Sequence, residues 1–203
     1  DSVYFRKNKI STKDFKMVFP IDAFYDNTNV IHFIKNENKN SFLSLLHEVN
    51  KELGIPLHKP AKIEFKSSIK KNRNKIVIVR QNHKGKETAL KTTFDKTKFY
   101  AETKELGTFY LKCDTAKPIV EISNPKSQIP NSSIQVKITD NLSGIDIYNG
   151  YIDNRWVNFY YDAKNDVIEY KFDEFCSKGE HLLKIIVTDK VGNKTIAEQK
   201  FTY

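Results

Sequence analysis

Short runs of apolar and β-branched residues recur along the C-terminal half of the chain, and each is separated from the next by turn-forming residues. The runs span 119–122, 134–138, 145–152, 156–161, 167–172, 182–187 and 195–203. Asp, Asn, Gly and Pro dominate the intervening segments, such as DNLSG, DAKND and DKVGN, and supply left-handed backbone geometry or side-chain caps. Seven short strands with this spacing are typical of an immunoglobulin-like β-sandwich.

Alternation within one run supports the strand interpretation. Ile134, Val136 and Ile138 fall on one side of an extended chain, while the residues between them are polar or small. We therefore expect one face of this strand to line a core and the other to meet solvent.

The N-terminal half shows the same pattern less regularly. Strands are predicted at 15–19, 30–34, 63–66, 75–80, 88–92, 98–103 and 108–112. The segment SFLSLLHEVNKEL, residues 41–53, is ambiguous because its apolar residues also match a helical stripe, with Ser41 as a cap. Gly54 and Pro56 end the segment in either case.

The halves meet at CDTAKPIVE, where Pro118 favours an extended entry into the next strand. The sequence therefore predicts an all-β protein of two β-sandwich domains, a basic one over residues 1–113 and an immunoglobulin-like one over residues 114–203. A chain of 203 residues is long enough for two such domains.

Charge divides along the same boundary. The whole chain carries +9, made up of +11 through Cys113 and −2 beyond it. Thirty of the 34 cations are lysine, and only four arginines could read base edges through paired hydrogen bonds. We expect no specific nucleic-acid binding, whereas weak attraction to polyanions such as surface glycans stays open. The densest basic run, 66–80, is interpreted as the solvated end of a hairpin.

The sequence contains no recognisable catalytic or cofactor-binding motif. Its five histidines form no HxH or HExxH pair, and no GxSxG, P-loop or GxGxxG is present. We expect no catalytic residues, no zinc and no cofactor in this chain. Calcium could use Asp140, Asn141 and Asp146, or Asp189 and Asn193, but neither group offers six oxygens, so both are interpreted as hairpin turns.

Two cysteines, Cys113 and Cys176, cannot form a structural zinc site or a dense disulfide framework. A single bridge between them and a pair of free, half-buried thiols are both open, because sequence fixes no Cα separation.

Exposed aromatic residues are the remaining candidates for contact with a ligand or partner. In RWVNFYY, residues 155–161, a continuous strand would place Trp156 and Tyr160 on one face, where they could stack on a sugar or a protein side chain. A core position is the more common place for a Trp in such sandwiches. We therefore predict that Trp156 lies in the core and that Trp156→Ala costs about 3–5 kcal/mol of stability.

A longer series of residues resembles a known family. The segments ITDNLSGIDIYNGYIDNRWVNFYYDAKNDVIEYKFDE and KGEHLLKIIVTDKVGNKT are similar to the C-terminal immunoglobulin-like module of Bacteroidetes lysostaphin-type (LytM-like) zinc metallopeptidases. FPIDAFYDN, GIPLHKPAKIEF and FYAETKELGTFYLKCDTAKPIVEI resemble the β-rich region that precedes that module. No residue matches the family's zinc motifs, so the resemblance covers the accessory part only. It also favours irregular β structure for residues 41–53 and a structural role for His58.

The resemblance implies an exported protein, located in the periplasm, at the outer membrane or on the cell surface. The leading hypothesis is a non-catalytic scaffold or docking module whose partner is an envelope protein, peptidoglycan or a surface glycan. The alternatives are an accessory fragment of an active peptidoglycan endopeptidase and a glycan-binding module. Because the chain begins at Asp1 and its one Met is Met17, we expect a processed product or a fragment.

Two tripeptides match the O-glycosylation pattern that this origin implies, with Ser2 and Thr115 as acceptors. The alternative for the second is an extended linker whose Asp and Thr cap neighbouring backbone groups. No apolar run is long enough for a transmembrane segment, and the mean hydropathy is −0.57.

Overall fold

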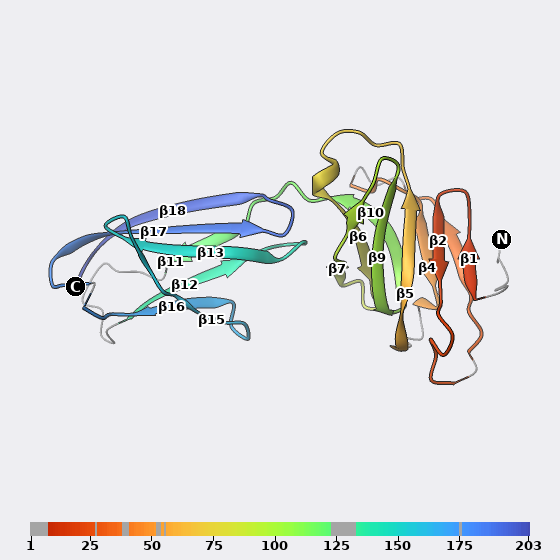
Figure 1. The fold of residues 1–203 in the computed structure, drawn as a ribbon, viewed down its shortest axis with the longest axis horizontal. Helices are drawn as coiled ribbons and strands as arrows, with labels where there is room; N and C mark the ends of the chain where they lie inside the picture. Colours follow the sequence, from red (N-terminus) through yellow and green to blue (C-terminus); the bar gives the residue numbers. More distant parts are fainter. Residues whose placement is uncertain are drawn as a thin grey trace. The chain divides into compact units, whose positions relative to one another are not determined.

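The computed structural model describes residues 8–26, 28–37, 41–51, 54, 56–122, 133–174 and 176–203. It divides the chain into two compact units, Asp1–Asp114 and Thr115–Tyr203, one residue beyond the boundary expected from sequence. Every strand pairing within these residues is antiparallel, and the all-β prediction is confirmed (Figure 1). None of the described helical turns has the length and apolar character needed to cross a membrane.

The first unit consists of two five-stranded sheets. One has the order β1 (Lys9–Ser11), β2 (Phe15–Val18), β5 (Pro56–Lys66), β9 (Lys98–Glu105) and β8 (Thr93–Phe94). The other has the order β3 (His32–Lys35), β4 (Leu46–Val49), β10 (Gly107–Cys113), β6 (Ile76–Gln81) and β7 (Glu87–Ala89). All seven strands expected from sequence are present, and β1, β4 and β8 are additional.

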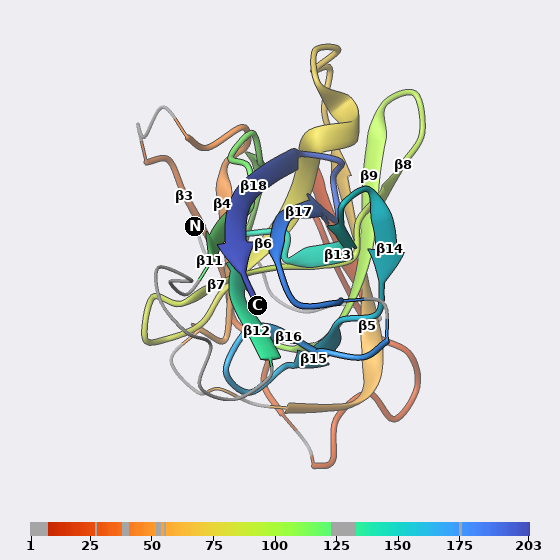
Figure 2. The same ribbon diagram turned by 90° about the vertical axis from the view of Figure 1, so that its left-hand side faces the viewer.

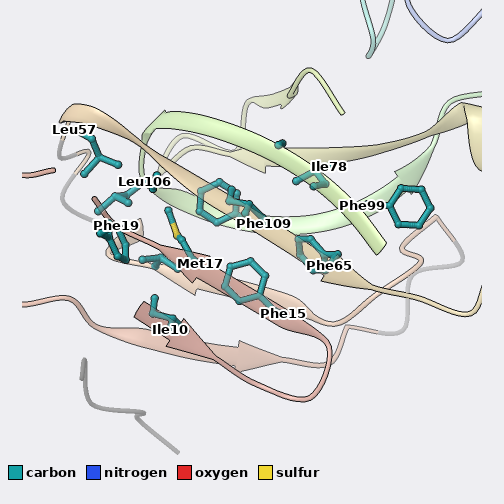
Figure 3. Close-up of a cluster of buried hydrophobic side chains, with 14 of the residues drawn as sticks. Ile10, Phe15, Met17, Phe19, Leu57, Phe65, Ile78, Phe99, Leu106 and Phe109 are labelled. Atoms are coloured by element: carbon teal, nitrogen blue, oxygen red, sulfur yellow. The ribbon is translucent and has the colours of Figure 1, made fainter. Parts of the chain in front are cut away.

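The core of the first unit is rich in phenylalanine. Alternate residues of β2 and β5 point into it, so that Phe15, Met17, Ile63 and Phe65 are at most 1% exposed, and Phe109 from the other sheet is fully buried (Figure 3). Burying side chains of this size supplies about 2 kcal/mol each, which makes this cluster the main stabilising element of the unit.

Residues 41–53 adopt β structure rather than a helix where they are described. Phe42 forms an isolated bridge with Lys112, and Leu46–Val49 form β4 between β3 and β10. All four residues of β4 are buried, because neighbouring strands flank it on both sides and both of its faces are covered. The helical periodicity was misleading because sheet pairing overrides a local stripe of apolar residues.

The basic run 66–80 is not a hairpin. It leaves β5 in one sheet, passes through the 3-10 helix η2 (Arg73–Lys75) and enters β6 in the other sheet. This crossover lies beside the β8–β9 hairpin in both views of the ribbon (Figure 1, Figure 2). Arg73 joins the two segments, since its guanidinium donates to the carbonyls of Ile69 and Asp95, each at 2.6 Å.

Replacing Arg73 by Lys is expected to destabilise the first unit by about 1–2 kcal/mol. The guanidinium carbon lies 4.6 Å from the Phe99 ring centre, and lysine keeps the charge but loses the planar fork that bonds both carbonyls. Urea titration followed by circular dichroism measures the change. Lys71→Ala, at an exposed position in the same crossover, serves as the control, and equal effects of the two variants would contradict the bridging role.

The second unit has two four-stranded sheets. One sheet has the order β11 (Ile119–Ile122), β12 (Ser133–Thr139), β16 (Val167–Lys171) and β15 (Tyr160–Asp162). The other has the order β14 (Arg155–Val157), β13 (Ile145–Ile152), β17 (Glu180–Asp189) and β18 (Lys194–Thr202). Lettered in chain order, these are strands A-B-E-D and C′-C-F-G. This pairing is the arrangement of an immunoglobulin-like sandwich.

One expected strand, 156–161, is divided in two. β14 pairs with β13, whereas β15 pairs with β16 in the opposite sheet, and the chain crosses between the sheets at Asn158 and Phe159. Phe159 is 4% exposed and packs over Gly150, where a Cβ would lie 2.2 Å from its ring. The side-chain-free surface of Gly150 therefore makes room for the ring at this crossing.

Candidate functional site

Trp156 lies on the outer surface of the second unit rather than in its core, so the core prediction was wrong. On β14 the inward residue is Val157, which is 3% exposed and pairs with Gly150, while Trp156 points outward and is 55% exposed. Its indole N–H donates to the Asn149 side-chain oxygen at 3.2 Å. The described core of the second unit consists instead mainly of aliphatic side chains with Phe159, Tyr170 and Phe201.

Further apolar side chains lie on the same outer surface of this sheet, on β13, β17 and β18. Tyr151 lies directly opposite it on β13, and the cross-strand pair Ile186 and Ile196 joins β17 to β18. Ile147 and Ile196 are 54% and 55% exposed. We call this surface the Trp156 face and define it by the residues Ile147, Tyr151, Trp156, Ile186 and Ile196.

Charged residues adjoin this face. Lys184 pairs with Tyr151 across β13 and β17, and its amine lies 3.1 Å from the carboxylate of Glu198 on β18. The register therefore places this lysine and glutamate in the same cross-strand row as Trp156 and Tyr151. Aromatic and aliphatic side chains mixed with paired charges are found at protein-contact surfaces, where aromatic residues contribute much of the binding energy.

Tyr160 does not share the Trp156 face. It pairs with Glu169 on β16, while its neighbour Tyr161 pairs with the buried Ile168, so Tyr160 points out from the other sheet and is 67% exposed. The crossing at Asn158 and Phe159 places the two aromatic residues on opposite outer faces of the sandwich. They therefore cannot stack together on one ligand, as a continuous strand would have allowed.

Trp156→Ala is expected to change the free energy of unfolding by less than about 1 kcal/mol, because the side chain is more than half exposed. Phe159→Ala, which removes a buried ring, is expected to cost about 3–5 kcal/mol. Circular dichroism during urea unfolding compares them, since Trp156 is the only Trp available as a fluorophore. A loss above about 3 kcal/mol for Trp156→Ala would show that the indole is structural.

The cysteines and candidate glycosylation sites are separate features. Cys113 belongs to the first unit and Cys176 to the second, and both are free thiols in the structure. Burial raises the pKa of both, to about 11 for Cys176, which keeps the thiols protonated and poorly nucleophilic at neutral pH. Thr115 is exposed in an extended segment, and Ser2 lies outside the described residues.

Two acidic turns that sequence treated separately meet at one end of the second unit. Asp140 and Asp189 have carboxylate oxygens within 4.8 Å of each other. Asp189 forms a hairpin turn by accepting bonds from the amides of Val191 and Asn193. DNLSG is not a hairpin, because it joins β12 to β13 in the opposite sheet, with Asp140 accepting from the Gly144 amide at 2.8 Å.

These turn bonds use most of the carboxylate oxygens. Oδ2 of Asp140 also accepts from the Leu142 amide, and Oδ2 of Asp189 accepts from the Asn193 side chain. The oxygen left over is Oδ1 of Asp140, which is buried and has no hydrogen-bond partner in the structure as described. The described pair therefore offers a cation one unused oxygen, Oδ1 of Asp140, whereas calcium takes six to eight oxygen ligands.

A buried histidine pair in the first unit was not foreseen from sequence. His32 on β3 and His47 on β4 are fully buried, and Nε2 of His32 lies 3.1 Å from Nδ1 of His47. Nε2 of His47 lies 3.4 Å from the Asp14 carboxylate, and the Phe15 ring stacks on His47 with centroids 4.2 Å apart. This arrangement lets each neutral ring donate from Nε2 and leaves Nδ1 of His32 as a buried acceptor without a partner.

Burial lowers the pKa of both histidines. The pKa of His32 falls to about 4, chiefly through desolvation and then through His47, while Asp14 partly opposes the decrease at His47. The sequence signal that could have identified the pair is the inward register of two polar residues on adjacent strands. The sequence does not show that β3 pairs with β4, so it could not reveal that the two histidines lie on the same inward face.

Comparison with known proteins concerns mainly the first unit. Residues 3–114 match the family described as the Zu5-like domain. A search among curated proteins found no match. The matched segment contains both five-stranded sheets and more than half of the sequence, so the chain belongs to the Zu5-like domain family.

Proposed function

We propose that the chain is a non-catalytic docking module of an exported cell-envelope protein and binds a protein partner through the Trp156 face. The observation that supports this most directly is the exposure of Ile147, Trp156 and Ile196, each more than half accessible, on one outer sheet surface. Large exposed apolar side chains gathered on one face of a soluble domain are a feature of protein interaction sites.

A protein partner fits this face better than a glycan does. Three of its five residues are isoleucines, which pack against apolar side chains but offer no flat ring for a sugar. The two aromatic residues first considered for glycan stacking, Trp156 and Tyr160, lie on opposite faces. The proposed export and envelope location rest on the resemblance to the accessory region of lysostaphin-type peptidases. The alternative that the parent protein is an endopeptidase rests on the same resemblance.

Site-specific photocrosslinking tests the docking surface. A benzophenone side chain placed at Ile196 and presented to the envelope fraction of the native host is expected to yield one discrete protein adduct. Trp156→Lys in the same chain should abolish it. The control carries the crosslinker at Tyr160, which is at least as accessible as Ile196 but lies on the other sheet. The same adduct from both positions, or none from Ile196, would contradict the proposal.

Cosedimentation with purified peptidoglycan distinguishes a glycan ligand from a protein partner for the Trp156 face. Binding that is unchanged by Trp156→Ala agrees with a protein partner for this face. Binding that is lost in Trp156→Ala and kept in Tyr160→Ala would assign the face to a glycan and overturn the proposed partner class.

Glycosylation at Thr115 is a separate expectation of an exported protein. Its exposed side chain can accommodate a bulky sugar. Intact mass of protein from the native host should exceed that of the bare polypeptide, and Thr115→Val should remove the part attached there. A native mass equal to that of the polypeptide would remove this support for export.

A further inference from the structure

The outer surface of the first sheet of the first unit carries lysines on four of its strands, β1, β2, β5 and β9. Inward residues of β1, β2, β5 and β9 fill the core, so the alternating residues face outward. Six of these outward residues are lysine. We call this surface the lysine face and define it by Lys9, Lys16, Lys62, Lys66, Lys98 and Lys104.

Carboxylates do not balance this charge. The outward acidic residues of the same strands are Glu64 and Glu102. Glu64 forms an ion pair with Lys98, in which the lysine Nζ lies 2.8 Å from Oε1 of the carboxylate. The other five lysines form no ion pair with any carboxylate in the described part of the chain. Glu64 lies directly opposite Lys16 and Glu102 directly opposite Lys62, whereas Lys66 and Lys98 lie opposite each other on β5 and β9. The face therefore has six lysines against two glutamates.

Side-chain spacing on a sheet suits a repeating ligand rather than one compact anion. Outward residues lie about 7 Å apart along a strand, and neighbouring strands about 5 Å apart. Six flexible lysines distributed at this spacing can neutralise successive charges of an extended polymer, each as a point charge.

We propose that the lysine face binds an anionic polysaccharide, through carboxylate or sulfate groups along its chain. Nucleic acid fits less well, because the face has no arginine, and its one aromatic residue, Tyr100, donates its hydroxyl to Asp95. A lipid surface fits less well because large exposed apolar side chains of the unit, such as Phe33 on β3 and Phe94 on β8, lie on strands that contribute none of these lysines.

Binding of the full chain to polygalacturonate and to dextran sulfate tests this surface and distinguishes carboxylate from sulfate recognition. At low ionic strength, Lys16→Gln, Lys62→Gln and Lys104→Gln combined are expected to weaken binding to at least one of these polymers by about tenfold or more. Neutral dextran should not bind. Salt should weaken the native interaction, because it screens exposed charges.

A matched variant separates this surface from net charge. Lys84→Gln, Lys86→Gln and Lys91→Gln combined remove the same charge at exposed positions elsewhere in the unit and should change affinity less than about twofold. Equal losses in the two triple variants would overturn the assignment. So would tighter binding to DNA or to vesicles containing phosphatidylglycerol than to either polysaccharide. Trp156→Lys should not weaken this binding, which makes the result independent of the proposed protein contact.

Discussion

Acidification from pH 7 to pH 4 is expected to destabilise the first unit by up to about 3 kcal/mol through His32 alone. The folded-state pKa of His32 is about 4, below its ordinary value of 6.5, because the ring is buried beside His47. As pH falls through this window the unfolded chain takes up the proton first. Stability is therefore complete above pH 6.5 and is lost progressively as pH approaches 4.

Hydrogen exchange of the β3 and β4 amides, measured across this pH range, reports the stability of the first unit separately from that of the second. His32→Gln removes the titrating group and should flatten the pH dependence even where it lowers stability at neutral pH. His83→Gln, at an exposed loop position, should leave the dependence unchanged. An unaltered pH dependence in His32→Gln would show that other groups cause the acid sensitivity.

The second unit has a histidine with the opposite response. A hydrogen bond to Asp153, with Nδ1 and the carboxylate 2.6 Å apart, raises the pKa of His181 above its ordinary value. This contribution to stability is complete below the unfolded pKa of 6.5 and is lost as pH rises through the folded value. Mild acidification should therefore favour the contact in the second unit while it weakens the first.

Gly150→Ala is expected to destabilise the second unit by about 3 kcal/mol, the upper range for forcing extra volume into a packed core. The new methyl carbon would lie 2.2 Å and 2.3 Å from two ring carbons of Phe159. The other six glycines have positive φ, so Gly150 is the one at which substitution tests space without backbone strain.

The double variant Gly150→Ala with Phe159→Ala should be less destabilised than the sum of the two single variants, because removing the ring makes room for the methyl. Asn149→Ala, at the adjacent outward position, is the control and should cost less than about 1 kcal/mol. Urea unfolding measures all four. Strict additivity would show that the Gly150 surface is not what accommodates the ring.

Local pattern was sufficient for the class of fold and for most strands. Alternation such as Ile134, Val136 and Ile138 depends only on which residues can line a core, and turn residues such as Asp189 and Gly192 act within a few positions of themselves. Strand positions and the division of the chain near residue 114 were therefore accessible from the sequence.

The candidate sites depended on which strands pair, and this only the tertiary structure decided. The sheet change at Phe159 separates Trp156 from Tyr160, although an unbroken strand would have kept them together. The pairing of β3 with β4 brings His32 to His47 across fourteen intervening residues. The sequence gives the polarity and the local conformational preference of each residue. The face of the sheet that a side chain occupies depends on which strands pair over long range and on the space available, such as the space beside Gly150 that the Phe159 ring fills.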